Sequence, residues 1–244
     1  MTDLEANLRS VQGRIAAAAK RAGRDPDDIT LVAVTKTQSV EGIRTAYELG
    51  LRHFGENRVE EAEAKVGALP ADIAWHMIGH IQSRKARRVP PLFQCVHSVD
   101  SLDLALRLDR LCADRFGRLP ILLEFNVSGE GSKSGFSAGH CAEDPADGQA
   151  LFACVEQIVA LPYLRLDGLM AMAPIVTDTE QARPVFACLR HLRDELRQVF
   201  PQVDWHHLSM GMTDDFEVAV EEGATFVRVG RAIFAPDQPA VCNR

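Results

Sequence analysis

The sequence lacks the features that mark several common protein classes. Its net charge is −7, so no excess of positive charge would draw it to nucleic acid or to an anionic membrane. No apolar run approaches the roughly 18 residues that a membrane-spanning helix needs. Residues 1–23 lack the basic start and apolar centre of a signal peptide and read instead as an amphipathic helix. We therefore expect a cytoplasmic protein that binds neither nucleic acid nor membrane.

Metal-binding and dinucleotide-binding motifs are also missing. No GxGxxG fingerprint follows the first predicted strand, which argues against a dinucleotide-binding open sheet. His76 and His80 are four residues apart, but their strand-to-loop context does not favour helical chelation, and we expect no metal site. The six cysteines show no CxxC or zinc spacing, and we expect most of them to be free, buried thiols; they stand at positions 95, 112, 141, 154, 188 and 242.

What the sequence does have is an alternation of short β-like runs with helical patterns. The eight predicted strands are Thr30–Thr35, His53–Gly55, Trp75–Gly79, Cys95–Val99, Ile121–Val127, Leu166–Met170, Trp205–Met210 and Phe226–Val229. The predicted helices between them are Val40–Leu49, Arg58–Val66, Gln82–Val89, Leu102–Arg115, Ala150–Ala160, Thr179–Val199 and Asp214–Glu222. Three of these helices have a candidate N-cap, namely Ser39, Ser101 and Thr213.

This alternation predicts a single (β/α)8 barrel with an extra N-terminal helix. Strands separated by helices form right-handed crossovers in a parallel sheet, and eight such units fit the ~250 residues of that fold. An open doubly wound sheet is the alternative. We expect a helix and lead-in over 1–28, the barrel over 29–235 and a tail over 236–244. No low-complexity linker divides the chain, and the longest loop, "SGEGSKSGFSAGHCAEDPADGQA", is interpreted as mobile or functional and not as a domain boundary.

Lys36 ends the first predicted strand, in the stretch "LVAVTK". In (β/α)8 barrels the chemistry lies where the strands end, at the C-terminal face. A lysine buried at such a point is costly unless it is paired, neutral or covalently modified. The alternative is that its side chain simply extends to solvent. Asn57 follows the second strand in "FGENR", where its amide could contact a ligand or serve the turn.

The loops after the last two predicted strands carry the features of a phosphate site. The segment "LSMGMT" places Ser209, Met210 and Gly211 after the seventh strand, and "VRVGRAIF" places Gly230 and Arg231 after the eighth. These two loops recurrently bind phosphate in such barrels, and glycine lets backbone N–H groups approach the anion. The pair of glycine turns therefore predicts an anion site at the barrel mouth.

Two acidic residues bear on how that phosphate would be held. Asp214 and Asp215 fall in the first turn of the helix after the seventh strand, where they would repel a phosphate dianion. We therefore expect Ser209, Gly211, Gly230 and Arg231, rather than the dipole of that helix, to supply the contacts.

Arg228 interrupts the apolar eighth strand two residues before Gly230. Strand alternation points both residues to the same side, so an inward Arg228 would lie just below the phosphate site. The alternative is a structural ion pair with an inward carboxylate such as Glu124 or Glu56, because buried arginines are usually paired.

A lysine, a phosphate cradle and an inward arginine around one mouth suggest a phosphate ligand that carries an aldehyde. Pyridoxal 5′-phosphate (PLP) satisfies all three, with the lysine forming an imine and the arginine facing the ring nitrogen. An arginine cannot give up its proton and would leave that nitrogen unprotonated. A Schiff-base aldolase acting on sugar phosphates is the rival, but it would want a carboxylate or tyrosine beside the imine.

The chain resembles the pyridoxal-phosphate homeostasis protein family. The resemblance rests on an ordered set of segments, "VAVTK", "HFGENRVEEAEAK", "WHMIGHIQSRKAR", "VHSVDS", "NVSGEGSKSGF", "LDGLMAMAP" and "LSMGMTDDFEVAVEEGATFVRVGRAIF". It runs from about Leu31 to Phe234 and implies a barrel similar to that of bacterial alanine racemase. Two positions depart from the pattern: Arg84 stands where asparagine is usual, and Arg231 stands where threonine is common.

The resemblance also implies a cofactor and the residues that hold it. Lys36 would carry PLP as an imine, Asn57 would contact it and Arg228 would lie at the pyridine nitrogen. The implied cofactor-binding set is Lys36, Asn57, Ser209, Met210, Gly211, Arg228, Gly230 and Arg231. Members of the family are regarded as carriers or regulators of PLP without an established turnover reaction, so we expect no catalytic residue.

A racemase-like enzyme is the alternative function. Racemisation needs two bases, and Lys36 could be one of them. In the racemases the other comes from an additional C-terminal domain, for which the residues after Phe234 are too few. His207 is a candidate substitute, although a structural role suits it better.

Three further features concern partners. The basic run at Arg84, Lys85, Arg87 and Arg88 is interpreted as a solvated helix face, or as a rim that guides PLP inward. Lys133 in the "GSKSG" loop could relay the aldehyde to or from Lys36. Apo forms of PLP-dependent enzymes are possible acceptors, and the sequence leaves a monomer and a weak dimer open.

Overall fold

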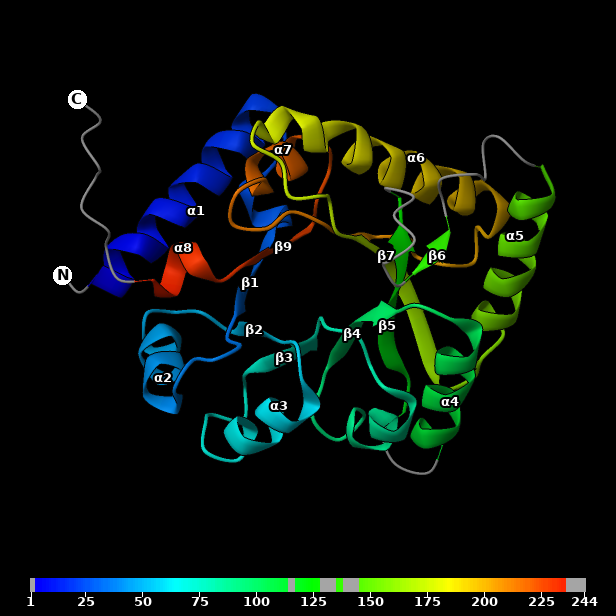
Figure 1. Cartoon of the computed structure of the whole chain (residues 1–244), viewed down its shortest axis with the longest axis horizontal. Helices are drawn as coiled ribbons and strands as arrows, with labels where there is room; N and C mark the ends of the chain where they lie inside the picture. Colours follow the sequence, from blue (N-terminus) through cyan, green and yellow to red (C-terminus); the bar gives the residue numbers. More distant parts are fainter. Residues whose placement is uncertain (1–2, 114–116, 128–134, 138–144, 236–244) are drawn as a thin grey trace.

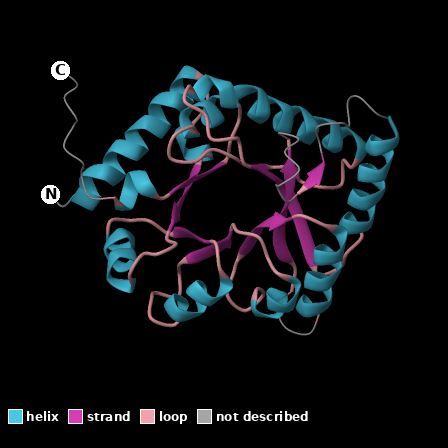
Figure 2. Cartoon of the chain, viewed as in Figure 1, coloured by secondary structure: helices cyan, strands magenta, loops and turns pink. Residues whose placement is uncertain are grey.

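The computed structural model describes residues 3–113, 117–127, 135–137 and 145–235. Eight of the strands in this part of the chain run parallel and close into a barrel, and helices surround it (Figure 1, Figure 2). The barrel strands are β1 (Thr30–Val34), β2 (His53–Glu56), β3 (Ala74–Met77), β4 (Cys95–Val99), β5 (Leu119–Asn126), β7 (Leu164–Ala171), β8 (His207–Ser209) and β9 (Phe226–Val229). The predicted barrel is thus confirmed.

The strand order is β4-β3-β2-β1-β9-β8-β7-β5, and a pairing of β4 with β5 closes the ring. A two-residue strand, β6 (Phe136–Ser137), pairs with the end of β5 and was not predicted. The first and last barrel strands lie side by side, with Val32 opposite Arg228 in their register. Chain segments almost 200 residues apart therefore meet at one place in the sheet, which positions the loop after β9 beside the loop after β1.

The helical elements lie outside the ring of strands (Figure 2). The α-helices are α1 (Asp3–Arg21), α2 (Val40–Glu48), α3 (Val59–Val66), α4 (Leu102–Cys112), α5 (Pro145–Val159), α6 (Arg183–Val199), α7 (Phe216–Glu221) and α8 (Arg231–Phe234). The 3-10 helices are η1 (Pro26–Asp28), η2 (Ser83–Arg88) and η3 (Thr179–Ala182). Among these described elements, no helix is long and apolar enough to cross a bilayer.

The helix ends agree with two of the three predicted caps. The Ser39 hydroxyl accepts the Gly42 N–H, and the Ser101 hydroxyl accepts the Leu104 N–H, as N-caps do. The prediction for Thr213 was wrong, because α7 begins later and its N-cap is Asp215. The Asp215 carboxylate accepts the Met212 N–H at 2.6 Å, so it stabilises the preceding turn instead of the helix end.

Two predicted helices differ from the observed ones in type or continuity, and a third, α5, begins at Pro145 and so earlier than predicted. Residues 82–89 form the short 3-10 helix η2 in place of an α-helix. The single helix expected over 179–199 is divided into η3 and α6, with Pro184 in the first turn of α6. Proline suits that turn because the N–H it lacks would have had no partner within the helix.

The N-terminal helix α1 covers one side of the barrel and contacts α7 and α8 (Figure 1). Its apolar face buries Leu8, Val11 and Ile15. On its polar face, Arg14 and Arg21 form ion pairs with Glu217 of α7 at 2.7 and 3.0 Å. The predicted lead-in helix is therefore packed against the barrel as part of its outer layer.

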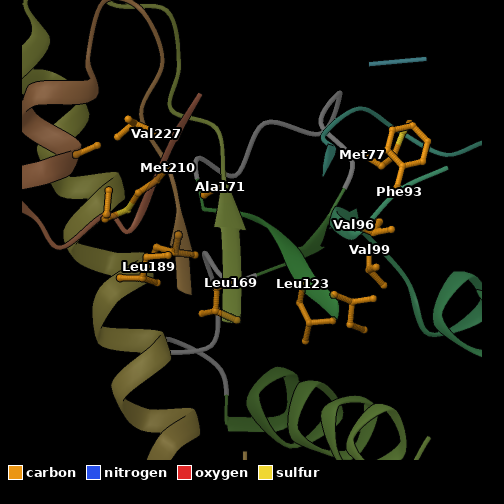
Figure 3. Packing of buried hydrophobic residues seen from close by; sticks show 14 of the residues in the cluster. Met77, Phe93, Val96, Val99, Leu123, Leu169, Ala171, Leu189, Met210 and Val227 are labelled. Atoms are coloured by element: carbon orange, nitrogen blue, oxygen red, sulfur yellow. The ribbon is translucent and has the colours of Figure 1, made fainter. Parts of the chain in front are cut away.

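Apolar side chains pack in two places. The larger cluster lies between the strands and the helices, and Figure 3 shows part of it with Leu169 of β7 and Leu189 of α6. A small second cluster lies inside the barrel and consists of Val32, Leu122, Met170 and Phe226. Strand alternation explains the division, since successive side chains point to opposite faces of the sheet. Several other inward positions are polar, among them Glu124, Ser209 and Arg228.

The cysteines that the structure describes are free, as predicted. Cys95 and Cys112 are buried and Cys154 is half-buried, whereas Cys188 is exposed, which the expectation of buried thiols did not anticipate. Cys141 and Cys242 lie outside the described residues.

Candidate functional site

Lys36 lies at the C-terminal end of β1, in a turn that follows Thr35. Its side chain is exposed, and no hydrogen bond or ion pair with another described residue engages it. The next residue, Thr37, has a positive φ of 66°, which is uncommon for a residue with a side chain and indicates a tightly defined turn. Lys36 therefore offers a primary amine at the barrel mouth, and its side chain does not occupy the interior.

A hollow of about 310 Å³ brings Lys36 together with Gly230 and Arg231. Its remaining lining residues are Val34, Thr37, Gln38, Phe234 and Ala235. This volume is at the lower end of the ~300–1,000 Å³ that is typical of ligand pockets. The amine and one of the two predicted glycine turns thus share one surface.

Position 230 favours glycine because its backbone lies close to β1. A Cβ atom at this position would lie 3.2 Å from the carbonyl oxygen of Val34 and 3.2 Å from its Cβ atom. A side chain at this position would press on the strand that leads to Lys36. The absence of a side chain also leaves the backbone of this turn open toward the hollow.

The other glycine turn is buried behind the mouth. Gly211 has a φ of +91°, and a Cβ atom there would lie 2.6 Å from the Cβ atom of Ala219. Its carbonyl oxygen accepts the backbone N–H of Arg228 at 3.0 Å, which ties the loop after β8 to β9. Met210, next to it, is fully buried. The two residues therefore shape the site from behind and do not line the hollow around Lys36.

Asn57 follows β2 and lines a different hollow, of about 570 Å³, with His80 and Lys85. Gly79 packs directly on it, since a Cβ atom at Gly79 would lie 2.3 Å from the Asn57 carbonyl oxygen. The structure thus fixes the backbone of Asn57 but does not place it in the hollow that contains Lys36.

Arg228 and Ser209 meet inside the barrel. Arg228 is 4% exposed, and its guanidinium donates to the Ser209 hydroxyl at 2.6 Å and to the Ala171 carbonyl oxygen at 3.0 Å. Burial lowers the pKa of Arg228 to about 10, although the carboxylates of Glu124 and Asp215 act to raise it. The inward orientation predicted for Arg228 is observed.

The carboxylates considered as partners of Arg228 do not pair with it. Glu124 faces inward and is 4% exposed, and burial raises its pKa to about 7, with Asp100 adding to the effect. No ion pair within 4 Å joins it to Arg228, and both residues belong to the described part of the chain. Glu56 was wrongly expected to be a possible inward partner, since it lies on the outer side of β2 beside α3.

Glu56 pairs with Lys65 of α3, a contact that the sequence did not reveal. The Lys65 ammonium group lies 2.7 Å from Glu56 Oε1 and also donates to the Thr35 carbonyl oxygen at 2.8 Å. The Thr35 hydroxyl donates to the same Glu56 oxygen at 2.6 Å. Burial raises the pKa of Glu56, against the two hydrogen bonds, which lower it. This buried cluster lies directly behind the backbone of Lys36.

Three histidines on neighbouring strands line the barrel interior and were not recognised as a group. His53 Nδ1 lies 3.0 Å from His76 Nε2, and His76 Nδ1 lies 2.9 Å from His97 Nε2. His97 Nδ1 lies 2.8 Å from the Ser209 hydroxyl. Burial lowers the pKa of all three, that of His76 to about 3. Strand alternation places all three at inward positions of β2, β3 and β4, and this pattern in the sequence could have identified them as a group.

Arg231 and Asp214 form an exposed ion pair at the mouth, with a separation of 2.5 Å. The expected repulsion between Asp214 and an anion is therefore offset by the neighbouring guanidinium. Asp215 is buried, and burial raises the pKa of its carboxyl group.

Two of the four side chains in the basic run form ion pairs, and the other two, Arg84 and Arg87, are exposed. Lys85 lies 2.7 Å from Glu60 of α3, and Arg88 pairs with Glu60 and Glu63. This pattern favours the interpretation of a solvated helix face over that of an anion-guiding rim. Lys133, the predicted relay lysine, lies outside the described residues.

The arrangement fits an anionic aldehyde. Lys36 supplies an amine that no described residue engages, Gly230 supplies an open backbone turn, and Arg231 and Arg228 supply positive charge above and below. An amine condenses with an aldehyde once it loses its proton, and guanidinium groups and glycine turns bind phosphate. The residues present are thus suited to PLP.

Comparisons with known proteins agree with this chemistry. The family model for the alanine racemase N-terminal domain matches residues 6–238. A pyridoxal phosphate homeostasis protein of Pseudomonas aeruginosa is 44% identical over 237 residues, which cover 96% of each chain.

Solved structures agree in fold. PipY of Synechococcus elongatus, in a structure with PLP bound, has a TM-score of 0.75 and 39% identity, and the match covers 90% of this chain and 99% of that one. An alanine racemase of Clostridium difficile has a TM-score of 0.70 at 13% identity, which shows the fold alone. That match covers 98% of this chain but only 58% of the racemase.

Proposed function

We propose a function from one premise: the chain belongs to the pyridoxal phosphate homeostasis protein family, which shares the fold of the alanine racemase N-terminal domain. The protein binds PLP and acts in PLP homeostasis by holding the cofactor and delivering it. The observation that carries this proposal is the position of Lys36, whose amine shares a hollow with the Gly230 turn and Arg231.

Lys36 is the residue that holds PLP as a covalent imine. Its side chain is exposed, and no described residue has to release it before it reacts. PLP supplies an aldehyde for this bond and a phosphate for the glycine turns. Backbone N–H groups at Gly230 and the guanidinium of Arg231 bind the phosphate, while Met210 and Gly211 fix the adjoining loop from behind. Asn57, which lines a different hollow in this structure, contacts the cofactor from the end of the second strand.

Arg228 faces the cofactor from inside the barrel and carries its positive charge without an ion-pair partner among the described residues. A guanidinium donates hydrogen bonds but does not give up its proton at neutral pH. A ring nitrogen that accepts from it therefore stays unprotonated and withdraws electrons weakly. This suits a carrier better than an enzyme that must stabilise a carbanion.

A racemase-like activity is the alternative, and it requires a second base opposite Lys36. His207, the candidate from the sequence, begins β8 and so lies toward the end of the barrel away from Lys36. Its ring bonds to the Thr225 hydroxyl at 3.1 Å, and burial lowers its pKa to about 4. Turnover of L- or D-alanine by the purified protein would favour the racemase and contradict the proposal.

The partners in this function are PLP itself and apo forms of PLP-dependent enzymes that receive it. We expect the chain to act as a monomer or a weak dimer. Mixing the PLP-loaded protein with an apo-enzyme should restore the activity of that enzyme at a rate that rises with carrier concentration. A rate equal to that of spontaneous PLP release would argue against delivery.

Retention of PLP on dialysis tests the role of Lys36. The wild-type protein should retain PLP on extensive dialysis and show the visible absorption of a bound cofactor, whereas Lys36→Met should lose both. Lys20→Met is a matched control, because Lys20 is an exposed lysine at the end of α1. Retention of PLP by Lys36→Met, with the same absorption as the wild type, would contradict the assignment.

A further inference from the structure

A line of four hydrogen bonds crosses the barrel interior and ends at Arg228. It runs from His53 through His76 and His97 to Ser209, with heavy-atom distances of 3.0, 2.9 and 2.8 Å, and the last step to Arg228 is 2.6 Å. We call His53, His76, His97 and Ser209 the histidine relay. Its members come from β2, β3, β4 and β8, so only closure of the barrel brings them together.

The direction of every bond in the relay follows from Arg228. A guanidinium can only donate, so the Ser209 hydroxyl accepts from it. A hydroxyl can accept twice, but its one proton also needs an acceptor. His97 Nδ1 is the other partner of the Ser209 hydroxyl among the described residues, so we assign the proton to that bond. His97 must then carry its own proton on Nε2.

The same logic continues through the other two rings. His97 Nε2 donates to His76 Nδ1, and His76 Nε2 donates to His53 Nδ1. All three histidines are thus neutral, with the proton on Nε2. Burial lowers the pKa of His76 and of His97 far below the usual value for histidine, which agrees with neutral rings.

Aligned in this way, the dipoles of the relay all point their negative ends toward Arg228. Hydrogen bonds in a chain polarise one another, and the effect is strong where water is excluded. A buried guanidinium usually needs a carboxylate, yet no ion pair within 4 Å reaches Arg228 from the described residues. Glu124 and Asp215 act on it only from farther away.

We propose that His53, His76, His97 and Ser209 are positioning residues that hold Arg228 in one orientation and keep it charged without a carboxylate counter-ion. A carboxylate in that place would cancel the positive charge and repel an anionic ligand. The relay stabilises the charge and leaves it without a neutralising carboxylate inside the barrel. Its benefit for the cofactor rests on the proposed function, but the hydrogen-bond polarity does not.

A metal site is the competing interpretation of the same residues. His76, Cys95 and His97 have ligand atoms within 4.8 Å of one another, all of them buried. Two nitrogen ligands on one tetrahedral zinc ion, at bond lengths of ~2.0–2.1 Å, would lie about 3.3–3.4 Å apart. The facing nitrogens of His76 and His97 lie 2.9 Å apart, a hydrogen-bond distance. Burial also raises the pKa of the Cys95 thiol, which disfavours the thiolate that zinc requires.

Nitrogen NMR of histidine-labelled, full-length protein at neutral pH tests the relay without PLP. We expect His76 and His97 to be neutral with the proton on Nε2, and to show scalar coupling across the hydrogen bond that joins them. A proton on Nδ1 of His97, or a doubly protonated ring at either position, would overturn the proposal. The proposal would also be overturned if addition of Zn²⁺ alone moved the nitrogen chemical shifts of both rings to the values of metal-bound histidine.

Variants then test whether the relay acts on Arg228. Ser209→Ala removes the hydroxyl that accepts from the guanidinium. We expect the side-chain protons of Arg228 to exchange faster with water, and the dissociation constant for PLP to rise by roughly tenfold or more. His97→Leu should have the same effects. His97→Gln keeps one hydrogen-bond acceptor and one donor, so it should recover most of the slow proton exchange and PLP binding of the wild type. His207→Gln is the control, since that inward histidine bonds to Thr225 outside the relay.

The outcomes separate this proposal from the proposed function. If the wild type binds no PLP, the proposed function fails, and the proton exchange of Arg228 still tests the relay. Unchanged exchange and an unchanged absorption maximum of bound PLP in Ser209→Ala would overturn the relay while leaving the PLP site intact.

Discussion

The ammonium nitrogen of Lys65 lies 2.8 Å from the carbonyl oxygen of Thr35, the residue immediately before Lys36. The same nitrogen lies 2.7 Å from Glu56, which also accepts from the Thr35 hydroxyl. A buried ion pair thus fixes the strand end from which the amine of the site projects. The second oxygen of Glu56, Oε2, has no hydrogen-bond partner among the described residues. Loss of a partner of the other oxygen would therefore leave the buried carboxylate even less compensated.

Lys65→Met should destabilise the protein by about 3–5 kcal/mol, because it leaves the Glu56 carboxyl group buried without its cation. Chemical denaturation checks this value. The double variant Lys65→Met with Glu56→Gln should regain part of the loss, since no buried carboxylate is left. Lys85→Met is the control, because the side chains of the Lys85–Glu60 pair are 30% and 41% exposed and loss of the pair should change stability by less than about 1 kcal/mol. Equal losses for both lysines would contradict this account.

Gly230→Ala should weaken PLP binding and destabilise the fold by about 1–3 kcal/mol. The added Cβ atom would lie 3.2 Å from the Val34 carbonyl oxygen, so β1 or the turn must shift. Gly67→Ala provides the comparison, because nothing lies within 4 Å of its added Cβ atom. PLP titration and thermal unfolding of both variants measure the effect. A Gly230→Ala protein that matches Gly67→Ala in both assays would show that the close approach is unimportant.

The contribution of Glu124 to the stability of the protein should fall as the pH rises from about 5 to about 7. Its pKa is raised to about 7 in the folded state, so the folded protein binds a proton there that the unfolded chain has released. The loss is on the order of 2–3 kcal/mol across this interval. Buried His76 and His97, with lowered pKa values, have the opposite slope, so stability rises with pH up to their unfolded pKa near 6.5.

The difference between the wild type and Glu124→Gln isolates this contribution, since the histidines are common to both proteins. Denaturation curves at several pH values should show the stability of the wild type falling relative to Glu124→Gln as the pH rises from 5 to 7. A constant difference would mean that Glu124 titrates as an ordinary carboxyl group.

Arg231 and Asp214 should affect ligand binding far more than stability. Their side chains are 76% and 66% exposed, and an exposed ion pair contributes at most about 1 kcal/mol. Asp214→Asn removes a negative charge from the mouth and should tighten PLP binding severalfold. Arg231→Ala should weaken it, and both effects should shrink in high salt. An Asp214→Asn protein that binds PLP more weakly would show that the pair orients Arg231 for the ligand.

The barrel could be predicted from the sequence because its strands and helices alternate regularly and each has a clear local pattern. Strands Cys95–Val99 and Phe226–Val229 were predicted to the residue. Lys36 and Gly230 could be expected to meet because parallel strands end at the same face. Helix starts were less secure: the fold moved the start of α7 past Thr213 and used the Asp215 side chain in the preceding turn.

The contacts that hold the site in place could not be predicted in the same way. Lys65 belongs to the charged stretch "EEAEAK", which resembles any exposed helix face, and only the packing of α3 on β2 buries it against Glu56. The histidines at positions 53, 76 and 97 are far apart in sequence. Strand alternation indicates that each points inward, but the stagger of neighbouring strands decides which nitrogen meets which, and that stagger is a property of the closed barrel.

The measurement that tests the account most directly is borohydride reduction of the PLP-loaded protein, followed by peptide mass mapping. Reduction converts an imine into a stable secondary amine and so marks the lysine that held the cofactor. We predict one pyridoxyl adduct, on the peptide that contains Lys36, and its loss in Lys36→Met. An adduct on another lysine, with Lys36 unmodified, would contradict the account.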